Sequence, residues 1–483
     1  MADVLFIQPD IAQNWAYRIM HREERYIPPL TYLHLSSVLE EKGYSVKIID
    51  ARIRRDTKEI IKRELDKRPI LVGFSCMIGG QLLSLIDLSK LVKRYAPDIP
   101  VVWGGVHPSF FPLQTIREPY VDIIVKGEGE ISILRLCEAL VKDKDLKRIN
   151  GIVYKDNGEV FNNPNSSYVD LDTLPFPAWH LIKEDIHRYL YGGFFTISTS
   201  RGCPHGCRFC YNLKFNKRYR ALSSEKVLDQ IEYIVSRYGI RRISFLDDNF
   251  VANPKRVKDI CKGFKERGIN IEFRCDMRID AIEDSIIEEM AETGLKIIFT
   301  GVETGSSKIL DKSNKGISLV QIKRAAKILK RFDICADYSF ICGYPWETYG
   351  DIMATIEIAQ YLHDLDPRSR CTLELLTPNY GTPLYEELQN DYGFEPKENL
   401  EYWAKVNWKN TYGKVWIKDP IFYEYLIIIF YLRFYPVGRE GFPRLKRFIY
   451  PLKWWIDLRF KKRILKPAPE FRLLNYLVKM IIM

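Results

Sequence analysis

Short apolar segments alternate with amphipathic ones over the first 135 residues, and this alternation constrains the fold more than any other feature of the chain. The segments with strand character are residues 4–7, 46–50, 70–75, 100–105 and 121–125. Helical periodicity fills the intervals between several of them, as in residues 30–41 and 82–95. Apolar strands separated by amphipathic helices predict an α/β fold with a doubly wound, Rossmann-like parallel sheet.

The carboxyl ends of these strands are the expected ligand site, because open parallel sheets bind their ligands there. Small and polar residues follow three of the strands: Ser75, Gly104-Gly105-Val106-His107 and Gly127-Glu128-Gly129-Glu130.

A second series of strands and helices follows. Its six expected strands are residues 194–198, 243–247, 271–275, 297–301, 337–341 and 372–376. Six strands with crossover helices favour a partial (β/α)6 barrel, two strands short of the closed form. We therefore predict a doubly wound domain at 1–140, a linker at 141–188, the partial barrel at 189–383 and an α-rich, aromatic and basic region at 384–483.

Three of the ten cysteines, Cys203, Cys207 and Cys210, are clustered with the spacing C-x3-C-x2-C. Glycine and proline residues keep this segment from forming a helix, so three thiolates can converge on one inorganic cluster. A four-iron cluster ordinarily takes four cysteines, and only three are local here, which would leave one iron with an open coordination position. A zinc site with His205 as the fourth ligand is the alternative.

In this segment the chain resembles the radical S-adenosylmethionine (SAM) superfamily, whose signature is this spacing with an aromatic residue before the last cysteine. The resemblance implies a [4Fe-4S] cluster on the three cysteines, SAM bound to the open iron, and one-electron reduction that cleaves SAM to a 5′-deoxyadenosyl radical. It also implies an electron donor such as flavodoxin or ferredoxin. The residues that it assigns to SAM are Phe209, Asp247, Asp248, Glu303 and Gly343. Turn-forming glycines with helix caps are the alternative for the segments around Glu303 and Gly343.

Residues 28–35, 104–108 and 125–130 resemble the cobalamin-binding domain that precedes many radical SAM domains. Small residues at the strand ends would let a flat macrocycle approach the backbone. The residues that the resemblance assigns to cobalamin are Ser75, Gly104, Gly105, His107, Gly127, Glu128, Gly129 and Glu130. Asp185-Ile186-His187 is followed by Leu190 in place of the glycine of the cobalt-ligating motif, which implies cobalamin without a histidine on cobalt. An ordinary doubly wound domain with structural turn glycines is the alternative.

These resemblances imply an enzyme that uses a radical to methylate, oxidise or cyclise a small-molecule substrate, and we expect methylation of an unactivated carbon because it is the commoner outcome. The run 378–385 and the C-terminus after it are similar to the anaerobic magnesium-protoporphyrin cyclases, which use the same cofactors for oxidation or cyclisation. A third hypothesis is a non-catalytic regulator whose basic tail binds nucleic acid. The sequence holds no recognisable helix-turn-helix, so we expect no nucleic-acid partner.

Nearly all of the net charge of +11 lies in residues 431–483, which hold thirteen basic and three acidic residues. An apolar run at 421–432 precedes them, and this combination suits the headgroup region of an anionic membrane. Sparse cysteines indicate a reducing compartment. We therefore expect a cytoplasmic protein with a peripheral contact to the inner membrane face and a lipid or isoprenoid substrate. The alternative is that the apolar run packs against the barrel.

Overall fold

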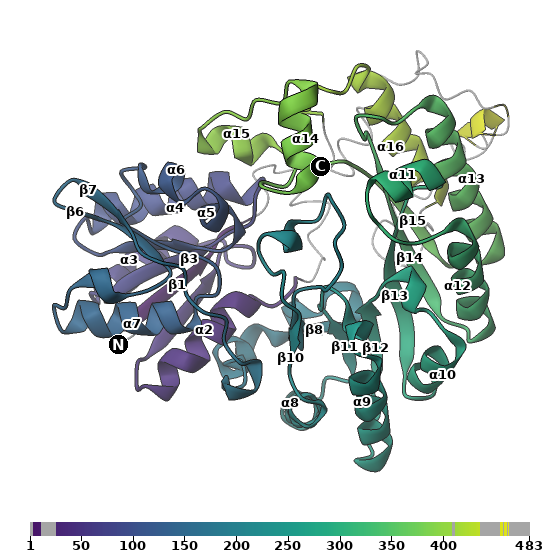
Figure 1. Cartoon of the computed structure of the whole chain (residues 1–483). Coiled ribbons are helices and arrows are strands. Elements are labelled where there is room, and N and C mark those ends of the chain that lie inside the picture. Colours follow the sequence, from purple (N-terminus) through teal and green to yellow (C-terminus); the bar gives the residue numbers. More distant parts are fainter. Residues whose placement is uncertain are drawn as a thin grey trace. The chain divides into compact units, whose positions relative to one another are not determined.

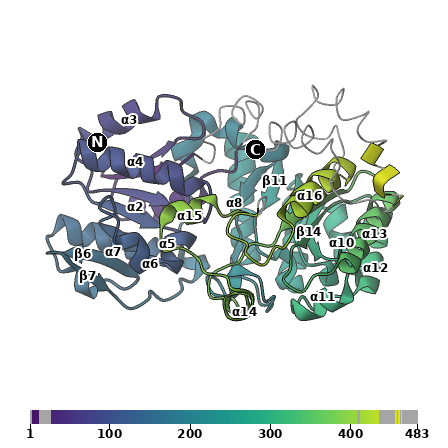
Figure 2. The same ribbon diagram turned by 90° about the horizontal axis from the view of Figure 1, so that it is seen from above.

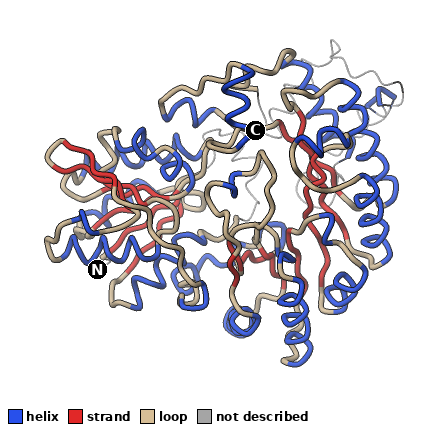
Figure 3. Tube along the Cα trace, viewed as in Figure 1, coloured by secondary structure: helices blue, strands red, loops and turns tan. Residues whose placement is uncertain are grey.

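The computed structural model divides into two compact units, and it describes residues 3–10, 26–407, 411–434, 455–456, 458–460 and 462. The first unit contains residues 3–10, 26–189 and 396–407, and the second contains the remaining described residues. Each unit has its own sheet and its own helices (Figures 1 and 3).

The first unit is built on a seven-stranded sheet in the order β2-β1-β3-β4-β5-β6-β7. Its strands are β1 (Val4–Gln8), β2 (Val46–Asp50), β3 (Leu71–Ser75), β4 (Val101–Gly104), β5 (Ile123–Val125), β6 (Ile152–Asp156) and β7 (Glu159–Asn162). Its longer helices are α2 (Leu30–Glu41), α3 (Thr57–Leu65), α4 (Gln81–Tyr95) and α7 (Glu130–Val141), with short α5 (Val106–Phe110) and α6 (Pro112–Ile116). Strands β1 to β5 are parallel, which confirms the predicted doubly wound sheet. The strand order reverses between β1 and β3, the position where such sheets bind ligands.

The region that the sequence suggests as a linker forms part of the first unit. Strand β6 pairs antiparallel with β5 from Ile123↔Tyr154 to Val125↔Ile152, and β7 completes a hairpin with it. The short helix α15 (Leu400–Lys405) belongs to the same unit and packs on α4. The first unit therefore extends beyond residue 140 and includes a segment from the region expected to be C-terminal.

The second unit contains six parallel strands in the order β15-β14-β13-β12-β11-β8, as predicted for a partial barrel. They are β8 (Phe195–Ile197), β11 (Arg242–Phe245), β12 (Glu272–Asp276), β13 (Leu295–Glu303), β14 (Cys335–Cys342) and β15 (Arg370–Leu375). The helices are α8 (Ser224–Tyr238), α9 (Pro254–Glu266), α10 (Asp284–Glu292), α11 (Ser307–Lys312), α12 (Leu319–Arg331), α13 (Tyr349–Leu365), α14 (Pro383–Tyr392) and α16 (Pro420–Phe434). Seen from above, α10, α12 and α13 form an outer layer beside β14 (Figure 2).

One face of the barrel strands packs on these helices, and the other lines the barrel lumen. Phe273 of β12 meets Phe264 of α9 with ring centroids 6.1 Å apart, so Phe273 faces the helix layer. Side chains alternate along a strand, and Arg274 and Asp276 therefore face the lumen. This alternation decides which residues can reach a ligand.

The apolar run near the C-terminus forms helix α16, which packs on β15 and α13. Tyr425, Leu426, Ile429 and Phe430 are fully buried, whereas Ile421 at the helix start is exposed. The run is therefore core rather than a membrane-facing surface. Several tail residues expected at a membrane lie outside the described residues: Arg444, Lys446, Arg447, Lys453, Trp454, Lys461 and Arg463. No helix in the described part of the chain is long and apolar enough to cross a bilayer.

Candidate active site

The clustered cysteines lie in one loop, which leaves the short strand β9 (Ser200–Arg201) and returns at β10 (Arg220–Ala221). Gly202 opens the loop with a φ of +82°. A Cβ at this position would overlap the backbone oxygens of Asn216 and Arg218. Glycine is therefore required for the chain to turn from β9 into the cysteine segment.

Asp247 and Asp248, just after β11, hold the base of the cysteine loop. Asp247 accepts hydrogen bonds from the backbone N–H of Thr199 at 2.7 Å and from the hydroxyls of Thr199 and Ser200 at 2.6 and 2.8 Å. Asp248 accepts a hydrogen bond from the N–H of Gly202 at 2.9 Å. Asp247 is 1% exposed, and burial raises the pKa of its carboxyl. Asp247 thus positions the loop, and contact of either carboxylate with SAM stays a prediction.

Two side chains from other barrel loops hold the far side of the cysteine loop. Asn314, after α11, donates to the carbonyl of Gly206 at 2.8 Å. Asn379, after β15, donates to the carbonyl of Phe209 at 2.9 Å. The backbone of the cysteine segment is therefore fixed from several strands of the barrel.

The three thiols differ in exposure but share one loop. Cys207 is buried, whereas Cys203 and Cys210 are partly exposed. Burial raises the pKa of Cys203 and raises that of Cys210 to about 12, so iron must displace their protons on binding. Within the described ranges, no three His, Cys, Asp or Glu side chains converge as ligands of a single metal ion, and this holds for the three cysteines alone as well as for the three cysteines with His205. Three sulfur donors on one pinned loop fit an iron–sulfur cluster with one open iron.

Arg278, which belongs to none of the sequence motifs, lies against the cysteine loop. It follows β12 and is 7% exposed. Its Nη1 lies 3.7 Å from Sγ of Cys207, within hydrogen-bonding distance of a sulfur acceptor. A buried cation next to a candidate cluster ligand is a feature that only the three-dimensional structure reveals.

Glu303 ends β13 with a φ of +69°, an uncommon conformation outside glycine. Its carboxylate folds back over Gly301, where a Cβ would overlap it. Lys315 donates to Oε1 at 2.5 Å, and both side chains are buried. Glu303 therefore has a protein partner at the mouth of the barrel, and its contact with SAM stays a prediction. Phe209 packs edge-on against Tyr344 in the same region, with ring centroids 6.4 Å apart.

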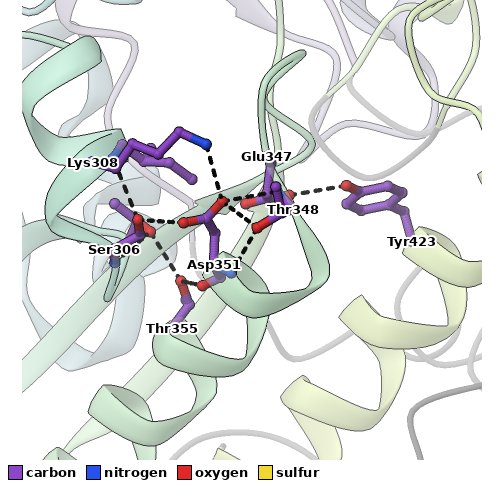
Figure 4. Close-up of polar contacts among 9 residues, drawn as sticks. Ser306, Lys308, Glu347, Thr348, Asp351, Thr355 and Tyr423 are labelled. Atoms are coloured by element: carbon purple, nitrogen blue, oxygen red, sulfur yellow. Dashed lines mark hydrogen bonds and ion pairs between the residues drawn. The ribbon is translucent and has the colours of Figure 1, made fainter.

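Gly343 forms the turn after β14, with a φ of +81°. Its N–H donates to Oε2 of Glu347 at 2.7 Å, and its carbonyl accepts from Nε1 of Trp416 at 2.8 Å. The hydroxyl of Tyr423 also donates to Glu347, at 3.0 Å (Figure 4). Burial raises the pKa of Glu347 to about 7, although both hydrogen bonds favour the carboxylate. Gly343 thus forms a turn, as the alternative in the sequence analysis states. Its contact with SAM stays a prediction.

Asp351 ties two barrel loops together (Figure 4). It accepts from the hydroxyl of Ser306, after β13, at 2.5 Å and from the hydroxyl of Thr348, after β14, at 2.6 Å. Lys308 lies 3.9 Å from the same carboxylate. Although burial opposes ionisation, these hydrogen bonds hold the pKa of Asp351 below its ordinary value. The two loops therefore form one rigid rim.

The lumen combines apolar side chains with an acidic one. Phe299 is in register with Asp276 on one side and Asp337 on the other. Phe299 is 42% exposed, and Leu246, after β11, is 44% exposed. Asp337 is paired with Arg370, whereas Asp276 makes no hydrogen bond or ion pair with the described residues. Burial raises the pKa of Asp276 to about 7. Leu246, Phe299 and Asp276 form what we call the lumen triad.

In the first unit, the strand ends at the switch point are joined by a tyrosine. The hydroxyl of Tyr32 donates at 2.8 Å to the carbonyl of Ile7, the penultimate residue of β1. The same hydroxyl accepts at 2.7 Å from the N–H of Ser75, the last residue of β3. Gly105 follows β4 with a φ of +94°, and a Cβ there would lie 2.6 Å from the carbonyl oxygen of Cys76. Glycine at 105 is thus required by the protein's own packing, before any ligand is considered.

His107 lies beside this edge and is fully buried. Neither ring nitrogen has a hydrogen-bond partner among the described residues. The ring packs on Phe111 and, edge-on, on Trp403, with centroid distances of 5.2 and 6.4 Å. Burial lowers the pKa of His107 to about 3, so the ring is neutral at physiological pH. A buried polar ring without partners, next to a glycine turn, fits an edge built to bind a polar macrocycle such as cobalamin.

The third strand end is more open. Gly127 has a φ of +68°, and a Cβ there would meet nothing within 4 Å. Its N–H donates to the hydroxyl of Ser109 at 2.9 Å. Glu128 accepts from the N–H of Val169 at 3.4 Å, and Glu130 begins α7 and is buried. The structure thus brings Ser75, Gly104, Gly105, His107 and the 127–130 segment to the same sheet edge, as predicted, and Gly129 lies there against Leu35.

Two family models match the chain. The Radical SAM superfamily model matches residues 197–359, and the B12 binding domain model matches residues 20–136. A protein named as an uncharacterised methyltransferase, PH0819 of Pyrococcus horikoshii, is 36% identical over 74% of this chain and 78% of its own length. The anaerobic magnesium-protoporphyrin IX monomethyl ester cyclase of Rubrivivax gelatinosus is 27% identical over 80% of this chain and 70% of its own length.

Solved structures share the fold. The cobalamin-dependent SAM radical enzyme OxsB, with aqua-cobalamin and SAM bound, superposes with a TM-score of 0.73 and 22% identity, covering 99% of this chain and 75% of that one. The radical SAM methyltransferase TsrM of Kitasatospora setae, with cobalamin and a [4Fe-4S] cluster, gives 0.68 and 17% identity over 82% of this chain and 76% of that one.

Proposed function

The chain belongs to the cobalamin-dependent radical SAM enzymes, whose cofactors are SAM, a [4Fe-4S] cluster and cobalamin, and we propose that it transfers a methyl group to an unactivated carbon of a hydrophobic small molecule. The observation that carries this proposal is the pinned loop that presents Cys203, Cys207 and Cys210 at the mouth of the partial barrel. Identity to a protein named as a methyltransferase supports methyl transfer over the other outcomes of the family.

The residues of this chain have separable tasks in the proposed reaction. Cys203, Cys207 and Cys210 would hold the cluster, and Asp247 keeps their loop in place through Thr199. When bound, the cluster and SAM supply a radical that abstracts hydrogen, and cobalamin supplies a methyl group. An external one-electron donor of the flavodoxin or ferredoxin type would reduce the cluster.

The lumen triad supports a substrate with an apolar carbon skeleton and one hydrogen-bonding group. Leu246 and Phe299 offer exposed apolar surface in the barrel lumen. Asp276 offers a carboxyl that the protein leaves without a hydrogen bond from the described residues. A lipid- or isoprenoid-like molecule with a hydroxyl or amino group matches this combination.

A test of the proposal uses SAM whose methyl group carries deuterium. Anaerobically reconstituted enzyme with cobalamin, a low-potential reductant and this SAM is expected to form 5′-deoxyadenosine and deuterated methylcobalamin. 5′-Deoxyadenosine without any labelled methylcobalamin would contradict methyl transfer. The Asp276→Asn variant is the matched control, because the proposal assigns its carboxyl to the substrate and not to either cofactor.

Oxidation or cyclisation is the second candidate, because the chain is also similar to the Rubrivivax gelatinosus cyclase over most of its length. That reaction would consume SAM as an oxidant only. The same experiment separates the two, since cyclisation predicts 5′-deoxyadenosine as the product of SAM while the label stays in methionine.

A further inference from the structure

Arg278 is held in a single orientation by three hydrogen bonds. Its Nε and Nη2 donate to the two carboxylate oxygens of Asp280, each at 2.9 Å. Nη2 also donates to the backbone carbonyl of Lys315 at 2.7 Å. A planar guanidinium held bidentately by a carboxylate keeps its remaining edge in a fixed direction.

The remaining edge of the guanidinium faces the cysteine loop. Nη1 lies 3.7 Å from Sγ of Cys207, and both side chains are buried. A second cation, Lys315, lies in the same region, but its Nζ donates to Glu303 at 2.5 Å, whereas Nη1 of Arg278 is the donor directed at a cysteine sulfur. The contact of Arg278 with a candidate cluster ligand is therefore a charge-assisted N–H···S interaction in a site screened from water.

We propose that Arg278 is a positioning residue that acts through Cys207 to raise the reduction potential of the iron–sulfur cluster. This rests on the proposed assignment of Cys207 as a cluster ligand. One electron enters from an external low-potential donor, no bond forms or breaks, and the reduced cluster gains one negative charge. A guanidinium N–H that donates to a ligand sulfur stabilises the more negative state, because hydrogen bonds to sulfur help to set the potential of such clusters. Asp280 offsets part of the guanidinium charge but leaves the Nη1–H donor directed at Cys207. Asp280 prevents the guanidinium from turning away.

The test is a redox titration of the full-length, cobalamin-loaded protein, followed by the electron paramagnetic resonance signal of the reduced cluster without SAM. At the midpoint potential of the wild type, Arg278→Met is expected to lower the ratio of reduced to oxidised cluster about tenfold, which is about 59 mV for a one-electron couple. Arg278→Lys keeps the charge but not the bidentate hold by Asp280, so it is expected to lower the ratio less than Arg278→Met does. Iron content is measured for every variant.

Arg274→Met is the matched control, because Arg274 lies in β12, four residues before Arg278, and donates to Ser244 and to the carbonyl of Tyr191. An equal shift in Arg274→Met and Arg278→Met would overturn the proposal, since it would reflect general loss of charge. So would an unchanged potential in Arg278→Met with full iron content. If Arg278→Met does not assemble the cluster, the midpoint potentials of Arg278→Gln and Arg278→Lys are compared instead. Equal potentials in these two variants overturn the proposal. A wild type without a cluster signal would instead overturn the assignment of Cys207, and the proposal with it.

Discussion

Asp247 spans the start of the cysteine loop by accepting both the backbone N–H and the hydroxyl of Thr199, at 2.7 and 2.6 Å. The carboxylate comes from the end of β11, and the threonine follows the neighbouring strand β8. One buried side chain therefore joins the frame of the barrel to the loop that carries the candidate cluster ligands.

Replacing Asp247 by Ala should destabilise the protein and the cysteine loop together. The change leaves buried donors of Thr199 and Ser200 unpaired, at about 1–3 kcal/mol each, so we expect the free energy of unfolding to fall by about 3–5 kcal/mol. Urea unfolding measures the loss of stability, and iron content after reconstitution shows whether the cysteine loop still binds the cluster. Asp229→Ala, at an exposed position of α8 that accepts from Arg267, is the control, with a change below about 1 kcal/mol. A reconstituted Asp247→Ala protein of wild-type stability would show that the carboxylate does not hold the loop.

His107→Leu should affect stability and cobalamin binding in opposite directions. Leucine removes two buried nitrogen atoms that lack partners among the described residues, so we expect the apoprotein to gain about 1–2 kcal/mol. If the ring serves cobalamin, the affinity for hydroxocobalamin should fall at least tenfold. Thermal unfolding and a spectroscopic binding titration give the two values. Loss of stability with unchanged affinity would assign His107 to packing alone.

Gly105 and Gly104 should respond differently to alanine. At Gly105 the new Cβ would overlap the backbone of Cys76 at a positive φ, so we expect destabilisation of about 1–3 kcal/mol with or without cobalamin. At Gly104 the nearest atom would be the carbonyl oxygen of Val125 at 3.6 Å, an ordinary contact. Gly104→Ala should therefore fold normally and report whether the corrin approaches this backbone. Wild-type cobalamin affinity in a bulkier Gly104→Val variant that folds would place the corrin elsewhere.

Asp276 should make stability depend on pH between about 4 and 7. Burial raises its pKa from 3.8 to about 7, so in this range the folded state keeps a proton that the unfolded state releases. Folding stability from this group therefore decreases as pH rises through that window and is constant above it. We expect Asp276→Asn to gain stability relative to the wild type between pH 5 and pH 8 in urea unfolding. Asp259→Asn, on the outer helix α9, should show no such trend, and a flat difference for Asp276→Asn would contradict the raised pKa.

The regular repeats of the sequence predicted the two sheets, because buried strands of parallel sheets are continuous apolar runs between helices. All six barrel strands were found from this pattern. The extent of the first unit was not predicted. Helix α15 joins this unit although it begins about 240 residues after the end of β7, and no local sequence pattern encodes such a contact. For residues 421–432 the structure shows the packing alternative, because hydrophobicity alone does not say whether an apolar helix faces a bilayer or, as here, packs on β15. A peripheral membrane contact of the basic tail stays a prediction.

The candidate site was predicted in part. The cysteines, glycines and carboxylates were found because they occur in short motifs with fixed spacing. Arg278 and Asp276 were missed, although they are two residues apart, because their significance depends on what the neighbouring strands and loops place against them. Gly105 was assigned to the corrin, whereas its conformation is already required by Cys76.

The most direct test of the central claim is the amount of 5′-deoxyadenosine formed from SAM by anaerobically reconstituted protein with a low-potential reductant. We expect the wild type to form it, and Cys203→Ala, Cys207→Ala and Cys210→Ala each to lose at least 99% of this activity. Cys261→Ala, which changes a buried cysteine between α9 and the sheet, should retain it. Wild-type 5′-deoxyadenosine formation and full iron content in Cys207→Ala, or none in the reconstituted wild type, would contradict the account.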